Sequence, residues 1–284
     1  MTQSTTRPDE RRADPLVHEP SGSLVSQSLV IVRRNLLHIK RMPEMLLDVT
    51  IQPVMFVLLF AFVFGGSIAT GAPAGYREWL LPGIMAQTIA FSSFIVAVGL
   101  TADIDKGIVD RLRSLPISRA AVLVGRSISS LIHSSIGIVV MSVTGLLIGW
   151  RAREGFVDTV TAYSLILLWG FAMIWFGILV GSLMRSVEAV NGFMFTTMFP
   201  LTFVANTFAP TEAMPRWLQV VAEWNPISSL VQATRELWGN VPPAPPDAAF
   251  PLQHPVLMSI VWSLVLTAVL APLALRAFRR RTEG

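Results

Sequence analysis

Few residues in this sequence are of the types that catalyse reactions, and their spacing forms no catalytic motif. The chain has no cysteine, and its four histidines, at positions 18, 38, 133 and 254, are scattered. No G-x-x-x-x-G-K-[ST] segment is present to cradle a nucleotide, and no H-E-x-x-H segment to bind zinc. We therefore expect no catalytic residue and no metal or cofactor bound by this chain, so that it is not itself an enzyme.

His133 is the one titratable residue deep inside an apolar run. It could relay protons, or it could hydrogen-bond to the serines that surround it between residues 127 and 135, since small polar residues favour contacts between membrane helices. Proton-coupled transporters usually place carboxylates within their spans. The middles of the apolar runs contain no Asp or Glu, which argues against an ion-driven carrier.

Phenylalanines recur every fourth residue in two segments, at 56, 60 and 64 and at 195, 199 and 203. On a helix this spacing makes a narrow row along one face. Gln52 and Asn206 lie near the two ends of these rows. The rows could line a slot in which flat apolar compounds stack, or they could face lipid or the protein core.

The elements that carry these residues are predicted to be transmembrane helices. The chain of 284 residues is 52% hydrophobic and 14% charged, against about 25% charged residues in an average soluble domain. Six runs free of Asp, Glu, Lys and Arg exceed 20 residues: 49–76, 79–102, 127–150, 159–184, 189–211 and 248–275. About 20 apolar residues span a bilayer as a helix. We expect an all-α membrane protein with six transmembrane helices over residues 48–276.

The distribution of basic residues predicts the orientation. Seventeen of the 22 Lys and Arg lie before the first run, after the last, or in the loops on the same side as the termini. Cytoplasmic loops carry the excess of Lys and Arg, so both termini are expected to be cytoplasmic. Because these residues flank the spans and form no groove-sized patch, the sequence argues against nucleic-acid binding.

The termini and the segment before the first span are predicted to lie outside the bilayer. Residues 1–22 and 277–284 are expected to be cytoplasmic tails, the first of them disordered. Residues 23–41 place apolar side chains every three or four positions, which predicts an amphipathic helix in the inner membrane interface, its basic residues among anionic lipids. An ordinary solvent-facing helix is the alternative.

The loop at 102–119 carries a stripe of apolar residues: Ile104, Ile108, Leu112 and Leu115. This spacing predicts a short amphipathic helix that Pro116 ends. Its stripe would rest either on the membrane surface or in a groove of a partner protein.

The long loop at 210–254 is predicted to hold two short helices outside the membrane. Apolar residues have helical spacing at 217–224 and again at 227–238, and Asn225-Pro226 separates the two pieces. Each is too short to span. We expect both to face the outer leaflet, where they close the exit, with tryptophans at headgroup level. Arg235 and Glu236 would be stabilised near headgroups or by neighbouring groups. A passive cap over the helix bundle is the alternative.

Residues 191–240 carry a set of motifs that resembles a known family. They comprise Pro200, Phe203, Asn206, Phe208, Pro210, Met214-Pro215, Trp217-Leu218, Asn225-Pro226 and Arg235. The loop Gly107–Arg119, with its Arg-Leu-Arg-x-x-Pro core, adds a weaker match. Together they are similar to type-2 ABC exporter permeases of the daunorubicin-resistance kind, with which the order of spans, the interfacial helix and the long fifth loop also agree.

The resemblance implies a permease subunit of an ATP-driven exporter that pairs with a second copy of itself. Two copies of a separate ATPase subunit would bind ATP and Mg, and the 102–119 loop would act as coupling helix through Asp105, Ile108, Arg111, Leu112 and Arg113. The substrate path would run along the dimer interface past Gln52, Phe56, Phe60, Phe199, Phe203 and Asn206. The outer gate would comprise Trp217, Trp224, Asn225 and Arg235.

The resemblance further implies a multi-pass protein in the plasma (inner) membrane of a bacterium, in contact with membrane lipids, that exports amphipathic drugs or lipid-like compounds. The same class also exports glycolipids and surface polymers. A secondary transporter is the alternative from another class, although the sequence shows no internal repeat. A membrane-embedded enzyme would need clustered His, Asp or Glu, which the sequence lacks.

Overall fold

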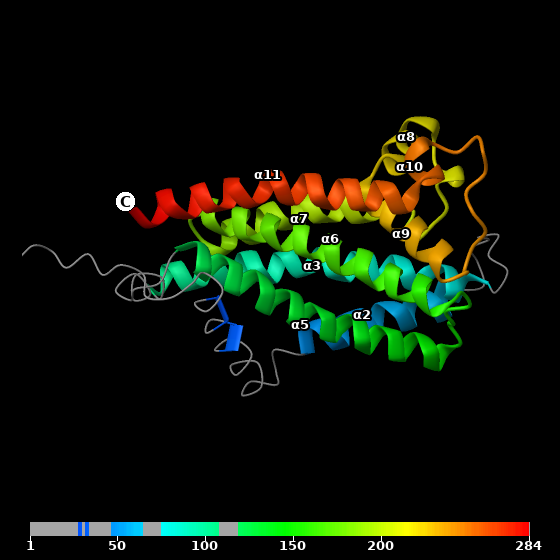
Figure 1. Cartoon of the computed structure of the whole chain (residues 1–284), viewed down its shortest axis with the longest axis horizontal. Helices are drawn as coiled ribbons and strands as arrows, with labels where there is room; N and C mark the ends of the chain where they lie inside the picture. The colour runs from blue at the N-terminus through cyan, green and yellow to red at the C-terminus, as the bar shows by residue number, and fades with distance from the viewer. Residues whose placement is uncertain (1–27, 30–31, 34–46, 65–74, 108–118, 284) are drawn as a thin grey trace, which may run out of the picture.

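The computed structural model describes residues 28–29, 32–33, 47–64, 75–107 and 119–283, whose regular elements are all helical. Four long helices lie roughly side by side along the molecule: α3 (Tyr76–Asp105), α5 (Arg119–Ile148), α6 (Phe156–Leu183) and α11 (Pro255–Glu283) (Figure 1). Each is long and apolar enough to cross a membrane. The prediction of an all-α membrane protein is confirmed.

Two of the six predicted spans form shorter helices. Helix α2 (Leu47–Leu59) contains Pro53 and continues as a π-helix, η2 (Phe60–Phe64). Helix α7 (Val187–Phe203) has 17 residues. The structure therefore shows four long apolar helices together with a shorter apolar one over Thr50–Val63, and the six-span arrangement stays a prediction.

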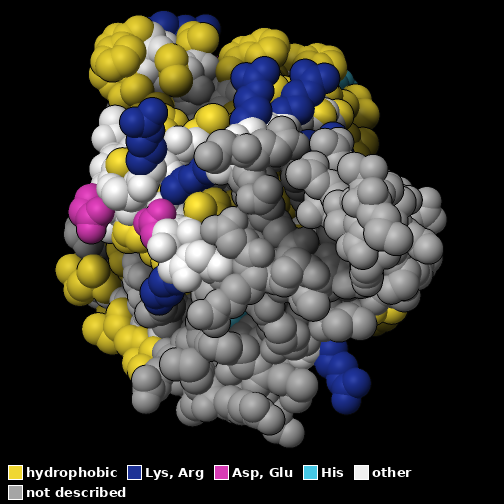
Figure 2. All heavy atoms as spheres, turned by 90° about the vertical axis from the view of Figure 1, so that its left-hand side faces the viewer, with side chains coloured by type: hydrophobic (Ala, Val, Ile, Leu, Met, Phe, Trp, Pro, Cys, Tyr) yellow, Lys and Arg dark blue, Asp and Glu magenta, His cyan; other side chains and the backbone are white. Residues whose placement is uncertain are grey.

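The two ends of the bundle differ in chemistry. At the basic end, α11 finishes with Arg276, Arg279, Arg280 and Arg281, and Figure 2 shows Lys and Arg side chains on this face with a hydrophobic rim. The opposite, capped end carries short helices, which are η3 (Thr211–Ala213), α8 (Arg216–Glu223), α9 (Pro226–Leu237) and α10 (Phe250–Gln253) (Figure 1). Helices α8 and α9 occupy the two places where short helices were predicted.

Helices α3 and α6 approach each other closely through small residues. A Cβ added at Gly177 would lie 2.2 Å from the Ser93 carbonyl oxygen, and one added at Gly181 would lie 2.7 Å from the Ala97 carbonyl oxygen. Small residues four apart allow membrane helices to pack backbone against backbone. The Thr101 hydroxyl adds a hydrogen bond to the Gly181 carbonyl at 3.0 Å. This contact makes α3 and α6 the central pair.

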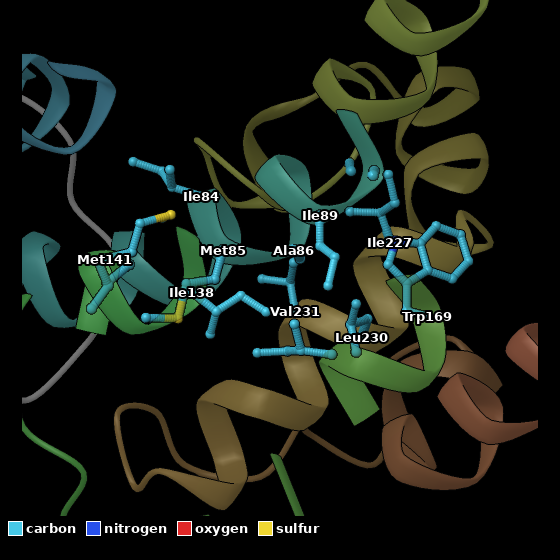
Figure 3. Close-up of a cluster of buried hydrophobic side chains, with 14 of the residues drawn as sticks. Ile84, Met85, Ala86, Ile89, Ile138, Met141, Trp169, Ile227, Leu230 and Val231 are labelled. Atoms are coloured by element: carbon cyan, nitrogen blue, oxygen red, sulfur yellow. The ribbon is translucent and has the colours of Figure 1, made fainter. Parts of the chain in front are cut away.

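Helix α9 lies inside the bundle, packed against α3, α6 and α11. Figure 3 shows Ile89 of α3, Trp169 of α6 and Leu230 of α9 in one buried cluster. The prediction that both short helices face the outer leaflet is therefore wrong for α9. Ser228 and Ser229 of α9 are buried, as are Ile227 and Leu230. Protein therefore encloses the polar side of this helix as well as its apolar side. Helix α8 does keep an exposed apolar face.

Several predicted features fall wholly or mostly outside the described residues. These are the 1–22 tail, most of the 23–41 helix, and residues 108–118 of the predicted coupling loop. Within 23–41, the described positions are helical, with Ser28 and Val32 buried and Leu29 and Arg33 exposed. The Ser28 hydroxyl donates to the Ala121 carbonyl of α5 at 3.4 Å, so one side of this segment contacts the bundle.

Replacing Gly177 by alanine should destabilise the protein. The new methyl group would overlap the α3 backbone, which cannot move aside as a flexible side chain would, and we expect a loss of about 1–3 kcal/mol in the free energy of unfolding. Gly192→Ala on α7 is the control, because a Cβ there meets open space. Thermal unfolding of both variants in detergent measures the difference. Equal unfolding temperatures for the two variants would contradict the close α3–α6 contact.

Candidate functional site

A cavity of about 240 Å³ lies between α2, α3 and α7, with α5 closing one side. Most of the residues that line it are apolar, and six of them are phenylalanines on neighbouring helices. The lining comprises Gln52, Pro53, Phe56, Ile84, Gln87, Thr88, Ile89, Phe91, Ser92, Phe94, Ile95, Ser134, Phe195, Phe199 and Phe203. An apolar cavity with a few polar groups is the common form of a small-molecule site.

Phenylalanine rings run in an unbroken series from α7 to α2. In order they are Phe195, Phe199, Phe203, Phe208, Phe60 and Phe56, with neighbouring ring centroids 4.6–5.9 Å apart. Phe208 follows α7 and stacks on Phe60 of the π-helix, so it joins the two rows that the sequence spacing predicted. Two rings of α3 meet the series at steep angles: Phe91 against Phe199, and Phe94 against Phe195.

The structure brings four of the six predicted path residues to this cavity: Gln52, Phe56, Phe199 and Phe203. Phe60 contacts the series of rings but is not among the lining residues, and the Phe64 side chain lies outside the described part. Asn206 is buried, and its backbone N–H donates to the Ser228 hydroxyl at 3.1 Å. His133 on α5 is half-buried and does not line the cavity.

Sequence reasoning named no residue of α3 for the path, although the resemblance implies that this second span lines it. Gln87, Phe91 and Phe94 are spaced as i, i+4 and i+7, so they share one face of this helix. A search restricted to phenylalanines at intervals of four does not find them. Gln87 could have indicated this face, because an amide inside an apolar run costs free energy unless it finds a hydrogen-bonding partner.

At the capped end, Arg235 is buried, with only 1% of its surface exposed. Its Nε donates to the Trp79 carbonyl and one Nη to the Asn206 carbonyl, both at 2.8 Å, and the guanidinium lies 3.5 Å from the Trp79 ring centroid. Burial lowers the pKa of Arg235, and Coulomb interactions with Tyr76 and Glu212 act in the opposite direction. Of the two predicted environments, headgroups or neighbouring groups, the structure shows the second: protein groups surround this cation.

Asn225 is the N-cap of α9 and connects it to α7. Its Oδ1 accepts from the Ile227 N–H at 2.9 Å, and its Nδ2 donates to the Leu201 and Val204 carbonyls at 2.7 and 2.6 Å. The four residues predicted for an outer gate therefore divide into two kinds. Asn225 and Arg235 are buried anchors, whereas Trp217 and Trp224 are exposed.

A second polar network at the capped end holds the start of α3. Buried Glu78 accepts from Arg153 Nε and Nη2 at 3.0 and 2.7 Å. These hydrogen bonds and the charge of Glu78 raise the pKa of Arg153. Asn240 donates to Glu78 at 3.3 Å and accepts from the Trp150 indole N–H at 2.9 Å. The α5–α6 loop and the segment after α9 thus both attach to α3.

At the basic end, Asp105 pairs with Arg281 of α11 at 3.3 Å. Arg281 also donates to the Gly181 carbonyl at 2.9 Å and to the Met184 carbonyl, at the end of α6. Asp105, the first residue of the predicted coupling set, therefore contacts α11 through Arg281, and Arg281 in turn contacts the end of α6. The other four, Ile108, Arg111, Leu112 and Arg113, lie outside the described residues.

Replacing Arg235 by methionine should destabilise the capped end. Methionine keeps much of the side-chain volume but removes the hydrogen bonds that Arg235 donates to the Trp79 and Asn206 carbonyls, and we expect a loss of about 2–4 kcal/mol in the free energy of unfolding. Arg216→Met on exposed α8 is the matched control, expected to lie within about 0.5 kcal/mol of the unmodified chain. Thermal unfolding in detergent compares them. An Arg235→Met variant as stable as the control would show that the buried cation is dispensable.

Residues 26–237 match the family model of the ABC-2 type transporter. The chain is 31% identical to the daunorubicin resistance ABC transporter permease protein DrrB1 of Streptomyces coeruleorubidus, over 92% of this chain and 88% of that protein. It is 23% identical to the probable doxorubicin resistance permease DrrC of Mycobacterium tuberculosis, over 91% of each, and 23% identical to the probable multidrug permease YbhR of Escherichia coli, over 72% of this chain and 53% of that protein. The chain therefore belongs to the ABC-2 type transporter family, as a multi-pass membrane permease.

Proposed function

We propose that this permease forms an exporter with a second copy of itself and two ATPase subunits, and that it moves amphipathic drug-like or lipid-like compounds out of the cell. The observation that carries this proposal is the cavity with its phenylalanine series, because such a lining suits apolar ring systems. The names of the relatives, which refer to daunorubicin and doxorubicin resistance, favour the same class of cargo.

We infer that the basic end faces the cytoplasm, with α2–η2 and α7 completing six spans. The arginines at the end of α11 gather at this end of the bundle, and the positive-inside rule assigns such an excess of basic residues to the cytoplasmic side. The capped end then faces outward. With its exposed tryptophans, α8 would lie in the outer headgroup layer.

The face that would meet the second copy contains α2 and α7. Phe195, Phe199 and Phe203 are 41–51% exposed although they also line the cavity, so the cavity opens toward this face. A second copy placed there would bring two cavities together and cover the exposed rings. The path in the resembled family lies at this interface.

The ATPase subunits would bind at the basic end through the 102–119 loop. Asp105 marks where this loop leaves α3, and its pair with Arg281 connects the loop to α11 and to the end of α6. A displacement of the loop by the ATPase would therefore reach three helices together. This connection supports the proposed role of the loop as coupling helix.

Phenylalanine-to-alanine variants test the proposed path. Resistance profiles of cells producing Phe56→Ala, Phe60→Ala, Phe199→Ala or Phe203→Ala, at matched expression, should change in which compounds are exported. Three of these rings line the cavity, and Phe60 stacks on Phe56 and supports it. Phe156→Ala, at an 83% exposed position of α6, is the control and should keep the original profile. If all four profiles keep the original ranking and magnitude, the proposed path is wrong.

Leu112→Asp tests the proposed coupling. A carboxylate in the middle of the apolar stripe should abolish substrate-stimulated ATP hydrolysis by the assembled exporter, while the permease still inserts into the membrane. Ser114→Asp adds the same charge to the opposite side of the predicted helix and should leave stimulation largely intact. Normal stimulation in the Leu112→Asp exporter would contradict the role of this loop.

A further inference from the structure

Two buried polar side chains of the cavity have hydrogen-bonding groups to offer. Gln87 of α3 and Ser134 of α5 are each 6% exposed, and both line the cavity. Within the described part of the chain, no hydrogen bond of either side chain is found, and neither has a fully enclosed polar atom without a partner. Their polar groups line the cavity and can pair with an occupant that offers a donor or an acceptor.

Phenylalanine rings of α7 that line the cavity stack on one another. Phe203 stacks on Phe199 with an interplanar angle of 1° and on Phe208 at 26°, and Phe199 has Phe195 as its other neighbour at 34°. Each of the two middle rings is therefore stacked between two neighbouring rings. The edges of aromatic rings carry partial positive charge, so the exposed edges of these rings attract the face of another aromatic ring.

The residues that line the cavity favour a neutral occupant. Among the described residues that line the cavity, none is Asp, Glu, Lys or Arg. A fixed cation or anion entering this space would lose hydration and gain no counter-ion, so its binding is disfavoured. A neutral molecule has no such cost.

Given the function proposed above, we infer that this cavity binds an uncharged, flat aromatic molecule that carries hydrogen-bonding groups on its edges. Gln87 pairs with one of these groups, because an amide offers both donors and an acceptor, and Ser134 adds a second polar contact. The phenylalanine series contacts the ring face. Amines that can ionise would enter in their neutral form.

Two tricyclic probes of similar size test the charge preference directly. Acridone is neutral and has a carbonyl and an N–H, whereas 10-methylacridinium is a permanent cation. Each is titrated by fluorescence into the purified full chain in lipid nanodiscs, with empty nanodiscs as background. We expect acridone to bind at least tenfold more tightly. Equal or tighter binding of methylacridinium, or no binding of acridone at all, would overturn the inference.

Variants of Gln87 test its role. Gln87→Leu removes the amide at similar volume and should weaken acridone binding by about three- to tenfold, the equivalent of one hydrogen bond. Gln253→Leu, at an exposed position of the capped end, is the control and should bind acridone as the unmodified chain does. Gln87→Glu, measured at pH 8.5, should shift the preference toward methylacridinium. Unchanged acridone binding by folded Gln87→Leu would overturn the role of Gln87.

ATP-driven uptake of acridone into inside-out vesicles, measured separately, distinguishes this inference from the proposed function. Gln87-dependent binding without ATP-driven uptake would refute the exporter and support the binding site. Uptake that is identical in the Gln87→Leu and unmodified exporters would refute the site and support the exporter.

Discussion

The guanidinium of Arg235 must find acceptors inside the protein, and much of the structure follows from where they are. Its two closest partners are the Trp79 carbonyl at the start of α3 and the Asn206 carbonyl just after α7. Because an unpaired buried cation is so costly, α9 can occupy its place only while these two segments stay together. The same two helices supply most of the cavity wall, so the buried cation holds one end of the candidate site in shape.

The rest of the bundle combines a rigid centre with a less supported flank. Glycines on α6 let its backbone touch that of α3, and Glu78 and its partners attach the outer loops to the same helix. On the other side of the cavity, α2 and α7 leave apolar side chains exposed, and the π-helix at Phe60–Phe64 interrupts regular helical bonding. Motion during transport is therefore expected on the α2–α7 side, against a fixed α3–α6 pair.

Several features could be read from the sequence because they depend on local composition and spacing. The apolar runs were long enough for helices, and helices form at all six. Phenylalanines at intervals of four share one face of a helix, and Phe56, Phe199 and Phe203 all line one cavity. Asn225-Pro226 marked the break between α8 and α9, since asparagine caps and proline begins a helix.

What the sequence by itself determined was therefore the helical class, the apolar segments and the faces of single helices. Only the tertiary structure decided that α9 enters the bundle, that Arg235 lies under the Trp79 ring, and that Gln87 faces the aromatic wall. The physical reason is the distance along the chain. Arg235 and Trp79 are 156 residues apart, and a periodic pattern says which face of a helix is apolar but not which other helix, lipid or cavity that face meets.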